Sequence, residues 1–150
     1  NMYPTFLAIH NIFRWLALIL LALAFLRALA GWLQKSAWTA SDRKLGTFSG
    51  IAMDVQLLVG LLLYFAFSPI TTMAFSNMAG AMSSSDLRFF VVEHLLLMVL
   101  AVVFTHLGSI LPRKASQDLQ KHKRAALWFG LALLMVLAGI PWFRPLFPAL

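Results

Sequence analysis

The chain has 150 residues, of which 61% are hydrophobic and only 11% are charged. Because charged residues make up about a quarter of an ordinary soluble domain, this composition excludes a soluble fold and indicates a multi-pass protein of the lipid bilayer. The sequence contains no cysteine, which excludes disulfides, iron–sulfur clusters and covalently attached c-type haem, and leaves non-covalent haem open.

Four apolar stretches are long enough to cross a membrane, which takes about 20 helical residues. None of them shows the alternation and hairpin turns of a transmembrane β-barrel. The sequence therefore predicts an all-α fold, with residues 1–150 forming a single transmembrane domain built as a four-helix up-and-down bundle. The expected helices cover residues of about 6–33, 45–67, 89–111 and 125–143.

The first predicted helix carries His10 and Arg14 within its apolar run. Four residues separate them, so they lie on one face of the helix, one turn apart. Ionisable side chains at membrane depth are costly and indicate a functional site. If the helix enters the membrane near Pro4, a rise of about 1.5 Å per residue places His10 roughly 9 Å below that boundary.

The second predicted helix contains Asp54, and we expect Ser41 or Asp42 to cap its start. Asp54 lies roughly 13 Å inside the cytoplasmic boundary by the same helical rise. The segment that follows, residues 68–86, is too polar to cross the membrane and is expected to form an outer loop with an interfacial helical part.

The third predicted helix contains the stretch RFFVVEHLLLMVLAVVFTHLG, which begins at Arg88 and includes Glu93, His94 and His106. If this helix enters from the same side as the first, His94 lies roughly 12 Å below the boundary. Its imidazole is therefore expected at nearly the same depth as that of His10.

The basic residues predict the orientation of the bundle. Cytoplasmic loops carry an excess of Lys and Arg, so we expect both basic loops in the cytoplasm and both termini outside. The net charge of +7 thus reports topology and does not indicate a nucleic-acid partner. The basic residues of the two loops are Lys35, Arg43 and Lys44 in the first, and Arg113, Lys114, Lys121, Lys123 and Arg124 in the second.

His10 and His94 suggest a haem b site in the outer half of the membrane. In an up-and-down bundle the first and third helices lie diagonally, about 11–14 Å apart, and a porphyrin with one imidazole on each face fits such a gap. Arg14 could neutralise Glu93 or a haem propionate, and Arg88 is a second propionate candidate. Glu93 could instead accept a hydrogen bond from a ligating imidazole.

The same two histidines have other interpretations. They could form hydrogen bonds between helices, while Arg14 and Glu93 form a buried structural ion pair. They could also hold another ligand, such as a quinone or the magnesium of a chlorin.

Three interpretations are open for His106. It could bind a second, inner haem together with His122, which lies in the basic run QKHKRA at the membrane surface and is otherwise an ordinary interfacial residue. It could form a structural hydrogen bond with Asp54 that joins two helices. The same pair could also relay protons or bind a quinone headgroup, with Gln56 nearby.

The blocks AIHNIFRW, SDRKLG, RFFVVEH and KHKRA, with a PW near the end, make most of the chain similar to small bacterial four-helix membrane proteins of the cytochrome-b-like type. The resemblance implies location in the bacterial cytoplasmic membrane and haem b ligated at the matching positions His10 and His94. His94 and His106 are closer in sequence than the ligands of di-haem helices, which argues against a second haem.

The predicted function is one-electron transfer by haem b, linked to a quinone or to a larger redox complex. The alternative is a non-catalytic accessory subunit of a respiratory or photosynthetic complex, whose polar residues fix helix contacts. A third hypothesis is an enzyme that handles haem or porphyrin. No catalytic residues are predicted, because the sequence contains no phosphate loop, no HExxH motif and no nucleophile elbow.

Overall fold

The computed structural model describes residues 1–144 and 146, and the regular secondary structure of these residues is helical throughout. Four helical segments are long and apolar enough to cross a membrane, which confirms the all-α fold and the number of helices capable of spanning. The four segments are Tyr3–Gln34, Ala40–Phe67, Ser85–Lys114 and Asp118–Gly139.

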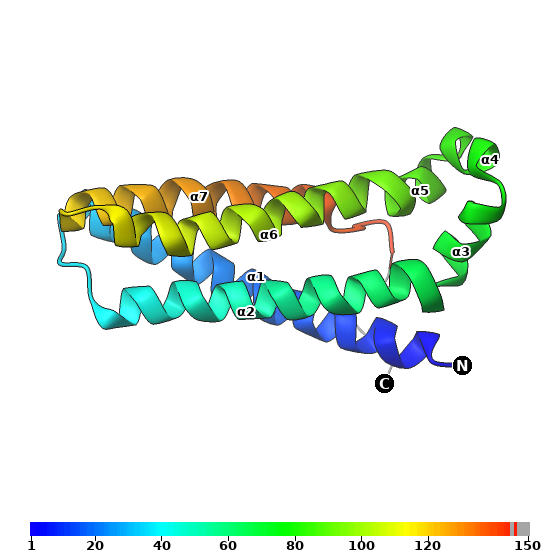
Figure 1. The fold of residues 1–150 in the computed structure, drawn as a ribbon, viewed down its shortest axis with the longest axis horizontal. Helices are drawn as coiled ribbons and strands as arrows, with labels where there is room; N and C mark the ends of the chain where they lie inside the picture. The colour runs from blue at the N-terminus through cyan, green and yellow to red at the C-terminus, as the bar shows by residue number, and fades with distance from the viewer. Residues whose placement is uncertain (145, 147–150) are drawn as a thin grey trace.

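The four long helices form a bundle in which each has two neighbours. Helix α1 (Tyr3–Gln34) packs against α2 (Ala40–Leu62) and α7 (Asp118–Gly139). Helix α6 (His94–Ile110) also packs against α2 and α7, so α1 and α6 lie diagonally. Figure 1 shows the chain reversing direction between successive long helices, with the α1–α2 and α6–α7 connections at one end.

Three short helices form the other end of the bundle, next to the N-terminus (Figure 1). They are α3 (Pro69–Ser76), α4 (Met78–Ser83) and α5 (Ser85–Arg88). This agrees with the expectation that the polar segment after the second helix does not span the membrane. A 3-10 turn, Leu111–Lys114, ends the third spanning segment at the opposite end.

The helices extend beyond several of the apolar stretches that predicted them. Helices α2 and α7 start at Ala40 and Asp118 rather than near residues 45 and 125, because polar residues also form helical first turns. Helix α7 ends at Gly139 and not near residue 143. Pro141 explains this end, since proline lacks an amide hydrogen and disfavours helical geometry in the residue before it.

The start of α2 is capped by Thr39, which corrects the prediction of Ser41 or Asp42. The Thr39 amide donates to Asp42 Oδ2 at 2.8 Å, and the Asp42 amide donates to Thr39 Oγ1 at 3.4 Å. This capping box satisfies two amides that would otherwise lack partners at the helix end. Asp42 also accepts a hydrogen bond from Arg27 Nε at 2.8 Å, so the cap ties α2 to α1.

Replacing Thr39 with alanine is expected to lower the free energy of unfolding by about 1 kcal/mol, because the Asp42 amide loses its acceptor. Titration of the detergent-solubilised protein with a denaturing detergent, followed by circular dichroism, measures this loss. Thr39→Ser keeps the hydroxyl and is the matched control. Equal stabilities of the alanine and serine variants would show that the cap contributes nothing.

Two π-helical turns interrupt the spanning segments at the end where α3–α5 lie. They are η1 (Leu63–Phe67), which continues α2, and η2 (Phe89–Glu93), which precedes α6. The Tyr64 hydroxyl of η1 donates to the carbonyl oxygen of Val91 in η2 at 2.8 Å, so the two turns are joined. Such turns are often found at functional sites, because the wider winding re-aims side chains.

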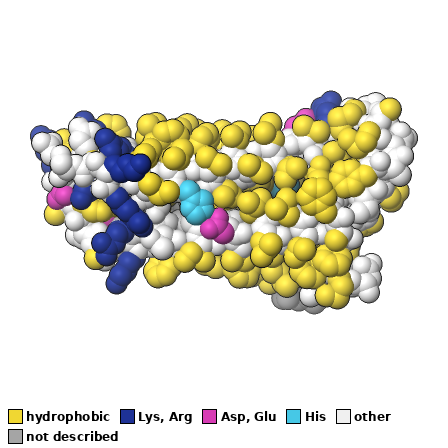
Figure 2. All heavy atoms as spheres, in the orientation of Figure 1, with side chains coloured by type: hydrophobic (Ala, Val, Ile, Leu, Met, Phe, Trp, Pro, Cys, Tyr) yellow, Lys and Arg dark blue, Asp and Glu magenta, His cyan; other side chains and the backbone are white. Residues whose placement is uncertain are grey.

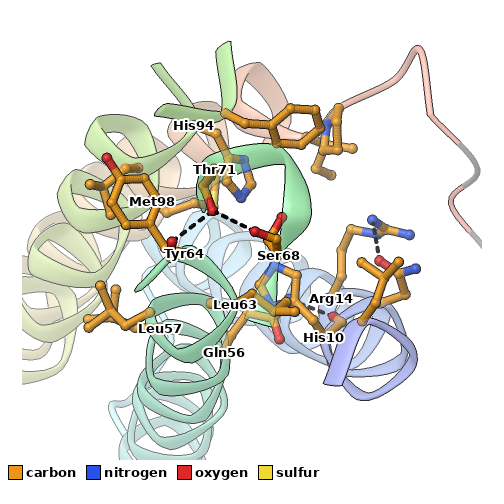
Figure 3. Close-up of a pocket in the computed structure, with 18 of the residues that line it drawn as sticks. His10, Arg14, Gln56, Leu57, Leu63, Tyr64, Ser68, Thr71, His94 and Met98 are labelled. Atoms are coloured by element: carbon orange, nitrogen blue, oxygen red, sulfur yellow. Dashed lines mark hydrogen bonds between the residues drawn. The ribbon is translucent and has the colours of Figure 1, made fainter. Parts of the chain in front are cut away.

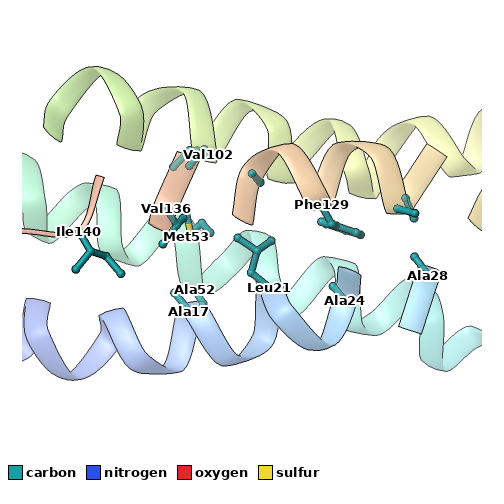
Figure 4. Close-up of a cluster of buried hydrophobic side chains, with 14 residues drawn as sticks. Ala17, Leu21, Ala24, Ala28, Ala52, Met53, Val102, Phe129, Val136 and Ile140 are labelled. Carbon is teal, nitrogen blue, oxygen red and sulfur yellow. The ribbon is translucent and has the colours of Figure 1, made fainter. Parts of the chain in front are cut away.

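A row of buried residues, all of them small except Leu21, allows α1 to approach its neighbours closely. The residues of this row are spaced three or four apart along α1, and all of them are buried. Figure 4 shows Leu21 pointing from α1 toward α7, between the levels of Val136 and Phe129. The main core cluster draws buried side chains from all four long helices, including Ala52 and Met53 of α2 and Ala101 and Val102 of α6. The row consists of Ala17, Leu21, Ala24, Ala28 and Gly31.

Candidate functional site

A cavity of about 400 Å³ opens inside the bundle near the short helices (Figure 3). Its volume lies within the range of about 300–1,000 Å³ that is usual for small-molecule and cofactor sites. The walls are mostly apolar, with side chains such as Leu57, Leu63, Met98, Val102 and Ile140. The polar side chains that interrupt these walls are fewer, and include His10, Asn11, Arg14, Gln56, Tyr64 and His94.

The imidazoles of His10 and His94 lie next to each other at this cavity. Their ring centroids are 6.2 Å apart, and the ring planes make an angle of 80°. The residues come from the diagonal helices α1 and α6, so the two rings reach toward each other across the bundle (Figure 3). The proximity expected from their calculated depths is therefore observed.

A backbone hydrogen bond determines which nitrogen of His94 is available to a ligand. His94 Nδ1 lies 2.6 Å from the carbonyl oxygen of Gly139. Because a carbonyl oxygen can only accept, Nδ1 carries the hydrogen, and the neutral ring keeps its lone pair on Nε2. Metal-ligating histidines usually have this arrangement, with the second nitrogen donating to a carbonyl or carboxylate.

Gly139 was not predicted to belong to the site, although the sequence contains the signal. It is the last residue of α7, so its carbonyl has no partner further along the helix. Pro141 marks this end in the sequence, and the structure places the Gly139 carbonyl within hydrogen-bond distance of His94 Nδ1. A side chain here would also collide with Met98 and come within 3.2 Å of Leu97 Cβ, so glycine allows α6 and α7 to approach.

His10 is held by contacts from α2. Gln56 Nε2 donates to the carbonyl oxygen of His10 at 2.8 Å, which fastens the two helices together at this level. The imidazole packs beside Gly60, where a Cβ would lie 3.3 Å from His10 Cε1. His10 Nδ1 is buried and has no hydrogen-bond partner among the described residues. A buried, unsatisfied ring nitrogen is a cost that a bound group or an ordered water can offset.

The distance between the two rings suits two axial ligands of one metal ion. An imidazole nitrogen binds a transition metal at about 2 Å, so two rings on opposite sides of one ion have centroids about 6 Å apart. The observed separation of 6.2 Å fits this value. Within residues 1–144 and 146, no group of three or more His, Cys, Asp or Glu could hold a metal ion. Haem iron needs only two protein ligands, because the porphyrin supplies the others.

Arg14 provides positive charge at the same cavity. Its residue surface is 7% exposed, Nη1 donates to Asn11 Oδ1 at 3.3 Å, and Nη2 donates to the carbonyl oxygen of Leu146. Its Nε is buried and has no hydrogen-bond partner in the part of the chain that the structure describes. No Asp or Glu among these residues forms a salt bridge with it. A buried cation with only neutral partners is suited to an anionic group of a ligand.

Glu93 pairs with Arg88 and not with Arg14 or an imidazole. The distance between Arg88 Nε and Glu93 Oε1 is 2.9 Å, and both side chains are nearly half exposed. The π-helical turn explains the pairing, because its i to i+5 winding brings residues five apart onto one side. Neither side chain lines the cavity. The prediction of Glu93 as a partner of the imidazoles or of Arg14 is therefore wrong, whereas Arg88 as a propionate contact stays a prediction.

His122 is fully buried, which corrects its interpretation as an interfacial residue. Its ring packs edge-on against Trp38 at 5.1 Å between centroids and lies against Gly31, and its Nε2 is 3.3 Å from the carbonyl oxygen of Ala37. Glycine at position 31 makes the space that the ring fills. The position of His122 within a basic run had predicted a surface residue, so its burial could not be anticipated from the sequence.

His106 pairs with Asp54, as one of the sequence interpretations predicted. His106 Nε2 lies 2.7 Å from Asp54 Oδ1, on the α2–α6 side of the bundle. His122 faces α1 and the α1–α2 connection instead. The structure therefore does not bring His106 and His122 together as the ligands of a second haem.

No protein-family model matches this chain, and neither a curated protein nor a solved structure is similar enough to it to suggest a function. The cavity and its two histidines are therefore the features of this chain that point to a function.

Proposed function

We propose that this chain is a membrane haem b protein that transfers single electrons, with His10 and His94 as the axial ligands. The observation that carries the proposal is the pair of imidazoles 6.2 Å apart at a largely apolar cavity. The hydrogen bond from His94 Nδ1 to Gly139, which leaves Nε2 free for a metal, supports the same assignment.

Haem, when bound, supplies a one-electron ferric–ferrous couple. The chain's own residues hold the group and set its surroundings. Arg14 would neutralise a propionate, since it is buried at the cavity without an acidic partner among the described residues. Leu57, Val102 and Ile140 would keep water away from the ring, and Gly139 would orient the His94 imidazole and raise its basicity.

The distribution of charge supports an orientation with both termini outside. Figure 2 shows Lys and Arg side chains gathered at the end of the bundle that holds the α1–α2 and α6–α7 connections. Under the positive-inside rule this end faces the cytoplasm, so the cavity would lie in the outer half of a bacterial cytoplasmic membrane. Electrons would then pass to or from a quinone or a larger redox complex at that level.

A reduced-minus-oxidised absorbance spectrum tests the function. The protein, produced in haem-replete bacterial membranes and purified in mild detergent, is expected to show a Soret band and the sharp α-band of reduced haem b. A pyridine haemochrome assay should give about one haem per chain, since one histidine pair lines the cavity. A helical but colourless preparation would refute the proposal.

A further inference from the structure

A hydrogen-bonded acid–base pair lies on the lateral surface of the bundle, which would face lipid, within the membrane-spanning region. His106 of α6 and Asp54 of α2 are 2.7 Å apart, and 42% and 52% of their side chains, respectively, are exposed. Asp54 is near the middle of the spanning segment Ala40–Phe67. Figure 2 shows a histidine beside an acidic side chain on the face that is drawn, with hydrophobic side chains next to them.

This position is unfavourable for a lone bundle in lipid. Ionisable side chains in spanning segments normally face the interior of a bundle or a water-filled cavity, because hydrocarbon offers them no hydrogen bonds. Asp54 uses Oδ1 for His106, and neither Asp54 Oδ2 nor His106 Nδ1 has a hydrogen-bond partner among the described residues. The pair therefore has unused polar atoms at a depth where lipid cannot satisfy them.

The shape of the surface favours a protein partner over a small molecule. Neither side chain lines the cavity that holds His10 and His94. Leu58, one turn from Asp54 on α2, and Val103, one turn from His106 on α6, are exposed apolar side chains. Small ligands are usually enclosed in a concave pocket, whereas an exposed two-helix surface can pack against other helices.

We propose that the α2–α6 face is the contact surface for a second copy of this chain, with Asp54 of each copy next to His106 of the other. Asp54 and His106 are hydrogen bonded, so the acid and the base lie at one depth in the membrane. Two copies inserted in the same orientation are related by a two-fold axis along the membrane normal, which preserves depth.

Rotation about this axis places α2 of one copy opposite α6 of the other. The contact between Asp54 of one copy and His106 of the other then forms twice, once on each side of the axis. The same patch serves both subunits, as a two-fold interface requires. The four side chains would satisfy one another and be removed from lipid. This inference does not depend on haem binding, because neither residue belongs to the haem site.

Disulfide cross-linking in native membranes tests the interface, and the absence of native cysteine makes engineered thiols specific. One tagged copy carries Leu58→Cys, and a second copy with a different tag carries Val103→Cys. Both side chains are exposed and lie on the same side of the acid–base pair, because α2 and α6 run in opposite directions (Figure 1). Mild oxidation is expected to give a disulfide-linked dimer that carries both tags.

The matched control pairs the Val103→Cys copy with a Leu23→Cys copy. Leu23 is exposed to a similar degree, but it lies on α1, the helix diagonal to α6. It is as far from the end of its spanning segment as Val103 is from the end of its own, so the two positions lie at a similar depth. No dimer with both tags is expected from this pair. A cross-link as strong as that of the test pair would indicate random collision and overturn the proposal.

Two further variants test the role of the charges. Introducing Asp54→Leu and His106→Leu together should lower the cross-linking yield at least about tenfold, since interhelical polar contacts are lost on both sides of the axis. Exchanging the two residues, with Asp54→His and His106→Asp, should restore the yield, because each acid again meets a base.

The outcomes separate a second copy from other occupants of this face. No cross-link in the test pair, as expected if a lipophilic ligand or a different protein covers the pair, overturns the proposal. An undiminished yield from the double leucine variant overturns it as well. If the leucine variant does not fold by circular dichroism, the exchange variant decides, and its failure to cross-link counts against the interface.

Discussion

Replacing His94 with alanine is expected to abolish the haem absorbance of the purified protein. The substitution would remove the proposed ligand atom Nε2 together with the hydrogen bond between Nδ1 and Gly139 that orients the ring. His10→Ala is expected to have the same effect, because only one imidazole would then remain to hold the proposed haem. The Soret and reduced α-bands, normalised to protein concentration, measure the loss.

Two controls separate ligand loss from misfolding. His106→Ala removes a histidine from the same helix but away from the cavity, so it should keep the full haem content. Imidazole added during haem loading should partly restore absorbance in the alanine variants, since the truncated side chain leaves a space of its size. Retention of the α-band in both His10→Ala and His94→Ala would contradict the ligand assignment.

Gly31→Ala is expected to lower the free energy of unfolding by about 1–3 kcal/mol, the usual cost of overpacking a close contact. A Cβ at this position would overlap the His122 ring, which is fully buried and packed against Trp38. The imidazole has little room to move, so α1 and α7 would have to separate. Denaturation of the purified protein in mixed detergent micelles, followed by circular dichroism, measures the loss.

Gly50→Ala is the matched control, because Gly50 also faces a histidine on a neighbouring helix. Its Cβ would lie 3.4 Å from His106 Cε1, which is an ordinary contact. The higher helix propensity of alanine should then leave stability unchanged or raise it by up to about 1 kcal/mol. In a His122→Ala background, Gly31→Ala should cost much less than in the parent, since the ring that it strikes is gone. Equal costs in both backgrounds would contradict the steric explanation.

Local properties of the chain explain why much of the fold could be predicted. Spanning helices depend on the length and hydropathy of continuous stretches, and the calculated depths of His10 and His94 depend only on helical rise. The two rings are accordingly found together in the structure. The pairing of His106 with Asp54 was one of the interpretations that the sequence left open, and the structure shows it.

The partners of the other polar groups could not be predicted, because they depend on helix rotation. The π-helical turn Phe89–Glu93 changes the direction in which the following side chains point, and it brings Glu93 to Arg88 rather than to Arg14. No feature of the sequence indicates that turn. His122 is buried for a similar reason, since the space it occupies is made by Gly31 on another helix.

The sequence alone thus determined the membrane environment, the all-helical fold, the four spanning segments and the common depth of two histidines. These properties follow from composition, apolar length and a constant rise along each helix. Only the tertiary structure decided which faces meet: it joined His94 to the carbonyl of Gly139, left Arg14 without an acidic partner among the described residues, and placed Asp54 and His106 on the outer surface. The physical reason is that rotation and packing of helices are set by close contacts between segments far apart in the chain.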